Sequence, residues 1–66
     1  MPYWPCNEYE LADGRRFICL SFESAEPVDD QPSRVTLYRI FWTHPERRHQ
    51  DVPPSAVEGA KHVRKL

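Results

Sequence analysis

The alternation of apolar and polar positions predicts two long β-strands in the middle of the chain, over residues 16–24 and 34–43. Side chains alternate between the faces of a strand, so apolar residues at both odd and even positions give two apolar faces. In the first strand these faces are Ile18, Leu20 and Phe22 against Phe17 and Cys19. In the second they are Val35, Leu37, Arg39 and Phe41 against Thr36, Tyr38, Ile40 and Trp42. Both faces of the resulting sheet need to be covered.

The flanking segments predict a hairpin before these strands and a helix after them. Asp13-Gly14 is typical of a tight turn and joins a short strand around residues 9–11 to the first long strand. Ser55 and Glu58 match a capping box, and the apolar residues that follow have helical spacing. We therefore predict an α+β fold: a small antiparallel sheet of two long strands and a short N-terminal strand, with one C-terminal helix on one face.

The prolines and the acidic residues divide the rest of the chain into three connecting segments. We expect an extended N-terminal arm over residues 1–7, an acidic loop over 23–33 and a proline-bracketed connection over 44–54. With 66 residues, the chain has room for the core of a single small domain, covering residues 1–66.

The second half of the chain also resembles the back half of an SH3-type barrel. Trp42, Pro54 and Ser55 match the tryptophan and the Pro-Ser stretch of that family. The resemblance implies an all-β barrel, in which a 3₁₀ turn replaces the helix and precedes a last strand. Ala56 stands where the family has an amide, and the tyrosine that should follow is absent. The SH3-like barrel is therefore the alternative fold.

Charge is distributed unevenly along the chain, although the formal net charge is −1. Residues 1–30 contain seven acids and two bases, whereas residues 31–66 contain seven bases and three acids. Such asymmetry points to charged partners. The sequence has no apolar stretch long enough to span a membrane and begins without a secretory signal, so we expect no membrane association and a cytoplasmic location.

The sequence offers two candidate partner-binding sites. One is the acidic loop, and the other is the sheet face that the helix leaves uncovered. The residues that we assign to them are Tyr38, Arg39, Trp42, Glu23, Glu26, Asp29 and Asp30. The alternatives for the face are core packing under the N-terminal arm, with Tyr3 and Trp4, or a second copy of the chain as a homodimer. Arg39 then needs a carboxylate partner, for which Glu10 and Glu23 are the candidates.

The basic half offers a second kind of site, in which phosphates bind cations and bases stack on aromatic rings. Its residues are Arg47, Arg48, His49, Lys61, Arg64 and Lys65. The spacing of His44 and His49 is acceptable for zinc ligands, but Cys6 and Cys19 are 13 residues apart and lack the short spacing of a cysteine pair, so we expect no metal and no cofactor. Pairing of the two cysteines is left open.

No nucleophile motif, phosphate-binding glycine loop or metal-activated water is indicated, so we expect no enzymatic activity. The pattern favours a non-enzymatic binding protein that modulates or inhibits a larger protein or nucleoprotein by occupying its working surface. In size and simplicity it resembles the small inhibitors and regulators of bacteria and phages, including anti-defence proteins such as anti-CRISPRs. The alternative is a small nucleic-acid-binding regulator that uses the basic half.

Overall fold

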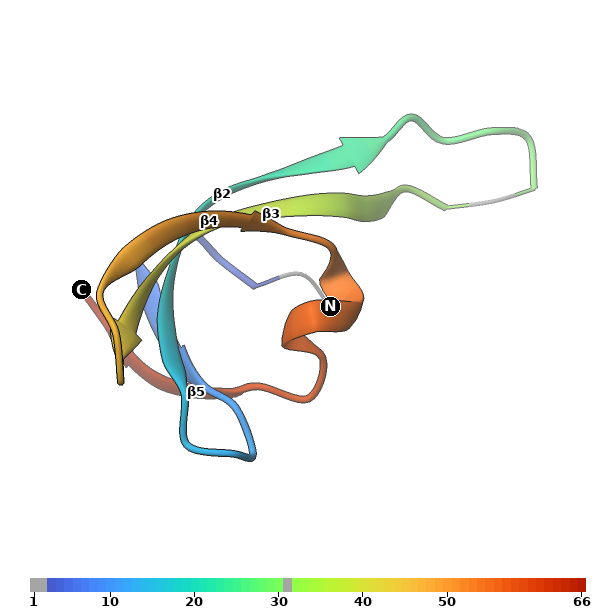
Figure 1. The fold of residues 1–66 in the computed structure, drawn as a ribbon. Coiled ribbons are helices and arrows are strands. Elements are labelled where there is room, and N and C mark those ends of the chain that lie inside the picture. Colours follow the sequence, from blue (N-terminus) through green and yellow to red (C-terminus); the bar gives the residue numbers. More distant parts are fainter. Residues whose placement is uncertain (1–2, 31) are drawn as a thin grey trace.

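The computed structural model describes residues 3–30 and 32–66, and over these residues the protein is all-β (Figure 1). The five strands are β1 (Asn7–Glu10), β2 (Arg16–Ala25), β3 (Arg34–His44), β4 (Arg48–Val52) and β5 (Lys61–Lys65). They form one open antiparallel sheet in the order β4-β3-β2-β1-β5. The one helical element of the described chain is a 3₁₀ turn, η1 (Pro54–Val57).

The predicted α+β fold is wrong, because the C-terminal segment is a strand and not a helix. Ser55 makes no side-chain cap, and Pro53 occupies the position before η1. Glu58 is already extended, with φ −64° and ψ 139°, and Gly59 follows with a positive φ of 79°. Beyond it the chain pairs with the free edge of β1, from Glu10 opposite Lys61 onward. Every residue of β5 is exposed, so backbone pairing, rather than burial of a periodic apolar face, decides its conformation.

The alternative SH3-like barrel is not formed either, since the sheet remains open with β4 and β5 as its two edges. The 3₁₀ turn and the last strand that the resemblance implied do occur, as η1 and β5. The segment 44–54, expected to be a connection, contains β4, which pairs with β3 from Trp42 opposite Arg48 to Tyr38 opposite Val52. Its sequence is polar because most of β4 is exposed on an edge.

The first half of the sheet forms where the apolar alternation predicts it. β2 and β3 are the two longest strands, and they pair along almost their whole length. β1 leads into β2 through a turn in which Gly14 has a φ of 93° and its N–H donates to the carbonyl of Leu11. A positive φ is the reason for glycine at this position.

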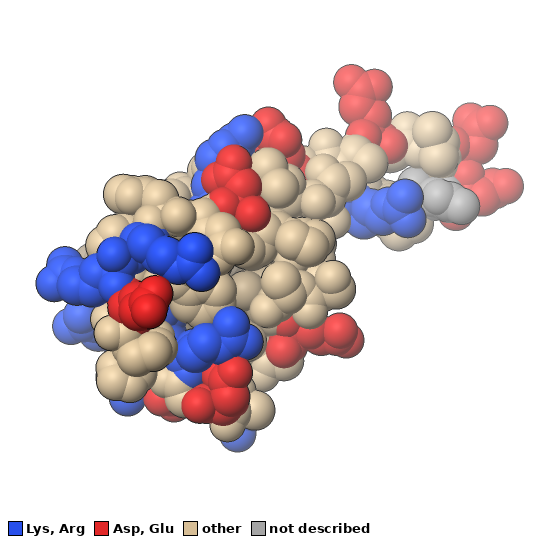
Figure 2. All heavy atoms as spheres, viewed as in Figure 1, with Lys and Arg blue, Asp and Glu red and all other residues tan. Residues whose placement is uncertain are grey.

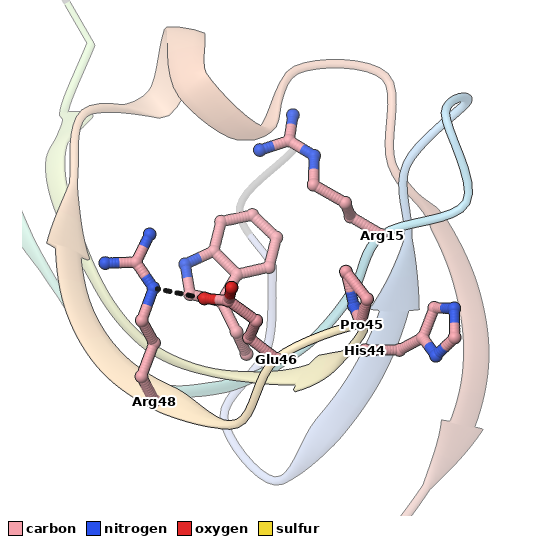
Figure 3. A pocket seen from close by; sticks show the side chains of 6 residues that line it. Arg15, His44, Pro45, Glu46 and Arg48 are labelled. Atoms are coloured by element: carbon pink, nitrogen blue, oxygen red, sulfur yellow. Dashed lines mark ion pairs between the residues drawn. The ribbon is translucent and has the colours of Figure 1, made fainter.

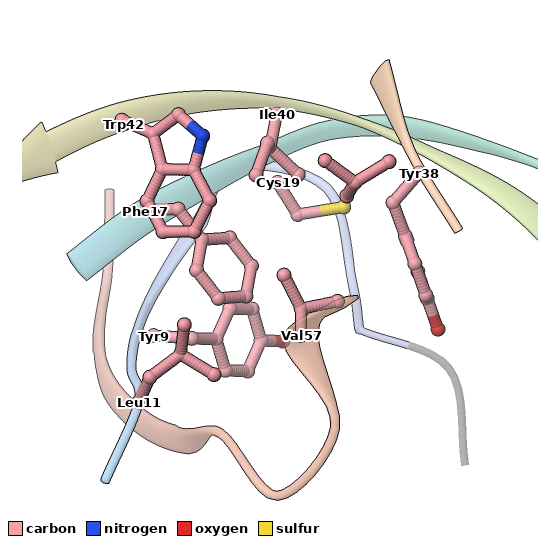
Figure 4. Close-up of a cluster of buried hydrophobic side chains, with 9 residues drawn as sticks. Tyr9, Leu11, Phe17, Cys19, Tyr38, Ile40, Trp42 and Val57 are labelled. Atoms are coloured by element: carbon pink, nitrogen blue, oxygen red, sulfur yellow. The ribbon is translucent and has the colours of Figure 1, made fainter. Parts of the chain in front are cut away.

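The core lies on the inner side of the curved sheet (Figure 4). Phe17 is fully buried at its centre, and its ring centroid lies 5.6–5.7 Å from those of Tyr3, Tyr9 and Trp42. Val57 of η1 is also fully buried and closes the core from the side opposite the sheet. A helix is unnecessary because the bent sheet, η1 and Tyr3 together enclose the apolar residues.

Beyond this core, β2 and β3 continue as a hairpin that projects from the body (Figure 1). We call residues 23–36 the arm. The projection gives the molecule an elongated shape, with extents of 41 × 21 × 19 Å. The predicted acidic loop therefore lies at the end of a two-stranded support, held away from the body.

Candidate functional site: the acidic arm and the outer face of the sheet

Tyr38 and Trp42, which the sequence suggested as partner-binding residues, are core residues. Their exposed fractions are 3% and 6%. The Tyr38 hydroxyl accepts a hydrogen bond from the backbone N–H of Tyr3 (3.1 Å), and the Trp42 indole N–H donates to Oε1 of Gln50 (2.7 Å). The assignment to a contact surface is wrong because the N-terminal segment covers this face, the alternative given by the sequence.

The opposite side of the sheet, which we call the outer face, has the half-buried and exposed apolar side chains. They are Ile18, Leu20, Leu37 and Phe41. Ile18 lies directly opposite Phe41 in the β2–β3 ladder, and Leu20 is 44% exposed. Sequence reasoning left these residues out of the site, although their alternation with the inner face places them beside Arg39. Arg47 and His49 pack on the ring of Phe41, and Leu20 is the most exposed of the four.

Arg39 lies on the outer face and pairs with a carboxylate of the neighbouring strand. Its guanidinium donates to Oε1 of Glu23 at 2.8 Å, and Glu23 is one of the two carboxylates expected as its partner. This hydrogen bond, with the charge of Glu23, raises the pKa of Arg39 above its ordinary value. Two of the predicted site residues therefore neutralise each other at the base of the arm.

The remaining acidic site residues are on the outer part of the arm. Glu26, Asp29 and Asp30 are exposed, and none of them makes an ion pair within the described residues. Val28 lies between them and is 64% exposed. Figure 2 shows the acidic side chains gathered at the end of the arm, away from the mixed charges of the body.

The predicted nucleic-acid-binding residues are divided between the two edges of the sheet. Arg48 and His49 belong to β4, whereas Lys61, Arg64 and Lys65 belong to β5. Several of them already have partners: Arg48 lies 3.9 Å from Glu46, and Arg64 lies 2.8 Å from Glu8. Arg47, just before β4, packs its guanidinium on the ring of Phe41 at 5.7 Å. The set therefore occupies separate strands instead of one continuous element.

Glu8 is the one buried charged residue of the described chain and ties three strands together. Its carboxylate accepts hydrogen bonds from Thr43 of β3 and Arg64 of β5, both at 2.8 Å. Burial raises the pKa of Glu8, but the two hydrogen bonds and the positive charge of Arg64 outweigh it and leave the pKa below its ordinary value. The ionised form thus stabilises the fold.

We predict that Glu8→Gln lowers the free energy of unfolding by about 1–2 kcal/mol at neutral pH, the scale of hydrogen bonds to a charged group. Because the folded-state pKa lies below the ordinary value of 4.5, the difference from wild type is present above that value and disappears as the pH falls through the lower, folded-state pKa. Urea titrations between pH 7 and pH 2 measure it. Glu58→Gln, at an exposed site, is the control and leaves the pH profile unchanged. A constant difference across the whole pH range would contradict the assignment.

A small pocket of about 160 Å³ lies at the end of the sheet opposite the arm (Figure 3). Its lining residues are Arg15, Trp42, His44, Pro45, Glu46 and Arg48. The Arg15 guanidinium lies 5.1 Å from the centre of the Trp42 ring and is paired with Asp13 at 2.8 Å. Both arginines of the pocket thus have nearby carboxylates, and Arg15 covers the indole ring.

Both cysteines are free: Cys6 is exposed and Cys19 is buried in the sheet. Burial raises the pKa of the Cys19 thiol, which lies 3.5 Å from the carbonyl of Tyr3. The two cysteines and the histidines His44 and His49 do not come together, and the described part of the chain contains no group of three or more metal-ligating side chains. Among the residues described, no helix has the length and apolar character of a membrane span.

The chain matches no protein-family profile, no curated protein and no solved structure.

Proposed function

We propose that this protein is a non-enzymatic binding protein that modulates or inhibits a larger protein or nucleoprotein by placing its acidic arm on a basic surface of that partner. The observation that supports this is the contrast between arm and body. Four of the six carboxylates of the body have basic partners, namely Glu8, Glu10, Asp13 and Glu46. On the arm, Glu26, Asp29 and Asp30 have none among the described residues.

The outer part of the arm contributes little to the stability of the isolated protein. Its three carboxylates are exposed and have no ion-pair partner among the described residues, and the exposed Val28 contributes little to the core. On a basic surface the same groups become favourable, since complementary charge accelerates association and a central apolar side chain adds contact area. The arm, with four acids and one base, therefore fits a partner whose working surface binds anions.

In the proposed mode of action the protein resembles the small inhibitors and regulators of bacteria and phages, anti-CRISPRs among them, that block a larger partner by occupying its surface. It requires no catalytic group, cofactor or metal from the chain itself. We propose that the protein acts in the cytoplasm and that its partner is a protein or a nucleoprotein.

Neutralising the arm tests the proposal. We expect that Asp29→Asn with Asp30→Asn lowers partner affinity at least tenfold and reduces its salt dependence, because the steering charge is lost. The matched control, Glu46→Gln with Glu58→Gln, removes the same charge from the body and leaves binding intact. Capture from bacterial lysate with the wild-type protein, followed by mass spectrometry, supplies the partner, and calorimetry with the purified partner measures the affinities.

Both double variants must keep the wild-type melting temperature, since the four residues are exposed and lie outside the core. An arm variant that binds the purified partner as tightly as wild type would refute the proposal. Loss of binding by the body control alone would refute it as well, because the contact would then lie on the body.

A further inference from the structure

The two edges of the sheet, β4 and β5, each have a row of backbone N–H and C=O groups that face away from the neighbouring strand. In the described chain, no backbone hydrogen bond outside the sheet ladders involves a residue of β4. Such an edge is a template for another strand. The side chains of the two edges decide which of them can accept one.

The β5 edge opposes pairing with a second copy of itself. Its five residues contain Lys61, Arg64 and Lys65 and no acid. In an antiparallel pairing centred on Val63, Lys61 of one copy would lie opposite Lys65 of the other, and like charges directly opposite are destabilising. The positive charge of β5 thus prevents this edge from pairing with the β5 edge of a second copy.

The β4 edge has the opposite property, because its charges are self-complementary. Arg47 and His49 both pack on the ring of Phe41, with His49 at a centroid distance of 4.8 Å, and Asp51 lies opposite Arg39. Arg47, His49 and Asp51 therefore share the outer face, with a cation two residues before His49 and an anion two residues after it. Neither Arg47 nor Asp51 has an ion-pair partner within residues 3–30 and 32–66.

We propose that two copies of this chain associate through β4, paired antiparallel about a two-fold axis at His49. Arg47 of each copy then lies opposite Asp51 of the other, which gives two symmetric ion pairs, and Arg48 lies opposite Gln50. The two sheets join into one continuous sheet of ten strands. The assembly closes at two copies, since the β5 edges that remain repel one another.

This inference is independent of the proposed function, because the arm takes no part in the contact. The antiparallel arrangement directs the two arms to opposite ends of the dimer, so that it presents two acidic arms. The strand is short and Pro53 and Pro54 follow it directly, so the contact is limited to a few residues and the dimer is weak.

Complementary charge variants test the pairing by sedimentation equilibrium at protein concentrations from about 10 μM to 1 mM, a range suited to a small interface. Wild type is expected to show a monomer–dimer equilibrium. Arg47→Asp and Asp51→Arg should each be monomeric, since each places like charges opposite, whereas an equimolar mixture of the two should form heterodimers. Arg34→Asp and Glu58→Arg make the same charge changes at exposed sites away from both edges and leave dimerisation unchanged.

The register itself is tested by crosslinking. In a Cys6→Ser background, His49→Cys places two thiols opposite each other on the two-fold axis, where the Cα separation suits a disulfide. We expect oxidation to give a covalent dimer, whereas Lys65→Cys on the other edge stays monomeric. A wild-type protein that is monomeric throughout the concentration range would overturn the proposal. Dimers that form equally in both single charge variants would also overturn it, as would a disulfide that forms in the Lys65→Cys variant and fails to form in the His49→Cys variant.

Discussion

Phe17→Ala is expected to lower the free energy of unfolding by about 3–5 kcal/mol, the range for removing a buried phenylalanine. Phe17 is fully buried and contacts the rings of Tyr3, Tyr9 and Trp42, so the cavity has no small residue that can fill it. A domain of this size has a total stability of about 0.05–0.15 kcal/mol per residue. For 66 residues this amounts to about 3–10 kcal/mol, so the substitution removes from about a third to all of the stability.

Phe41→Ala provides the matched control on the other side of the sheet. Phe41 is half-buried on the outer face, and its ring contacts Arg47 and His49, which are themselves exposed. We expect a loss of about 1 kcal/mol, since little of its apolar surface is removed from water. Urea unfolding of dilute protein, followed by tryptophan fluorescence, compares the two variants. Equal destabilisation by both would show that the inner and outer faces are wrongly assigned.

Tyr3→Ala is the second large effect, because this side chain covers the core from the N-terminal segment. Its ring lies 4.7 Å from that of Tyr9 and 5.2 Å from that of Tyr38, and its hydroxyl accepts from Ala60 N–H while donating to the carbonyl of Val57. Loss of the ring together with both hydrogen bonds should cost about 3 kcal/mol or more.

Two further variants separate the contributions of this side chain. Tyr3→Phe keeps the ring and removes the hydroxyl, which should cost about 1–2 kcal/mol, because the backbone groups near η1 lose their partner. Trp4→Ala truncates the neighbouring side chain, which is 56% exposed, and should change stability by less than about 1 kcal/mol. Thermal and urea unfolding measure all three. If Trp4→Ala lowered the stability as much as Tyr3→Ala, the assignment of Tyr3 as the residue that covers the core would be wrong.

Local patterns predicted the parts of the fold whose conformation depends on neighbours in sequence. The apolar alternation places Phe17 and Cys19 on one face of β2, and the structure buries both. Asp13-Gly14 predicts the first turn, and Gly14 has the positive φ that such turns need. Among the site residues, the pairing of Arg39 with Glu23 was one of two expected arrangements.

The prediction failed where long-range pairing outweighs local preference. Residues 56–66 have apolar spacing typical of a helix, but the unpaired edge of β1 recruits residues 61–65 as a strand. The sequence of β4 lacks the apolar alternation of a strand, because an edge strand buries few side chains. Its conformation is determined by its pairing with β3. Tyr38 and Trp42 were assigned to a surface because alternation identifies two faces without showing which of them the rest of the chain covers.

The sequence by itself determined the two long strands, the first turn and the separation of acidic from basic residues. These features follow from side-chain alternation, backbone preferences and charge, all of which act over a few residues. The predicted face of Ile18, Leu20 and Phe22 is wrong for Phe22, because a register shift between Cys19 and Ser21 places Phe22 opposite Tyr38, against the core. The tertiary structure alone decided the fifth strand, the burial of Tyr38 and Trp42 under Tyr3, and the projection of the acidic arm from the body. Each of these depends on contacts between residues far apart in the chain, whose free energy no local pattern contains.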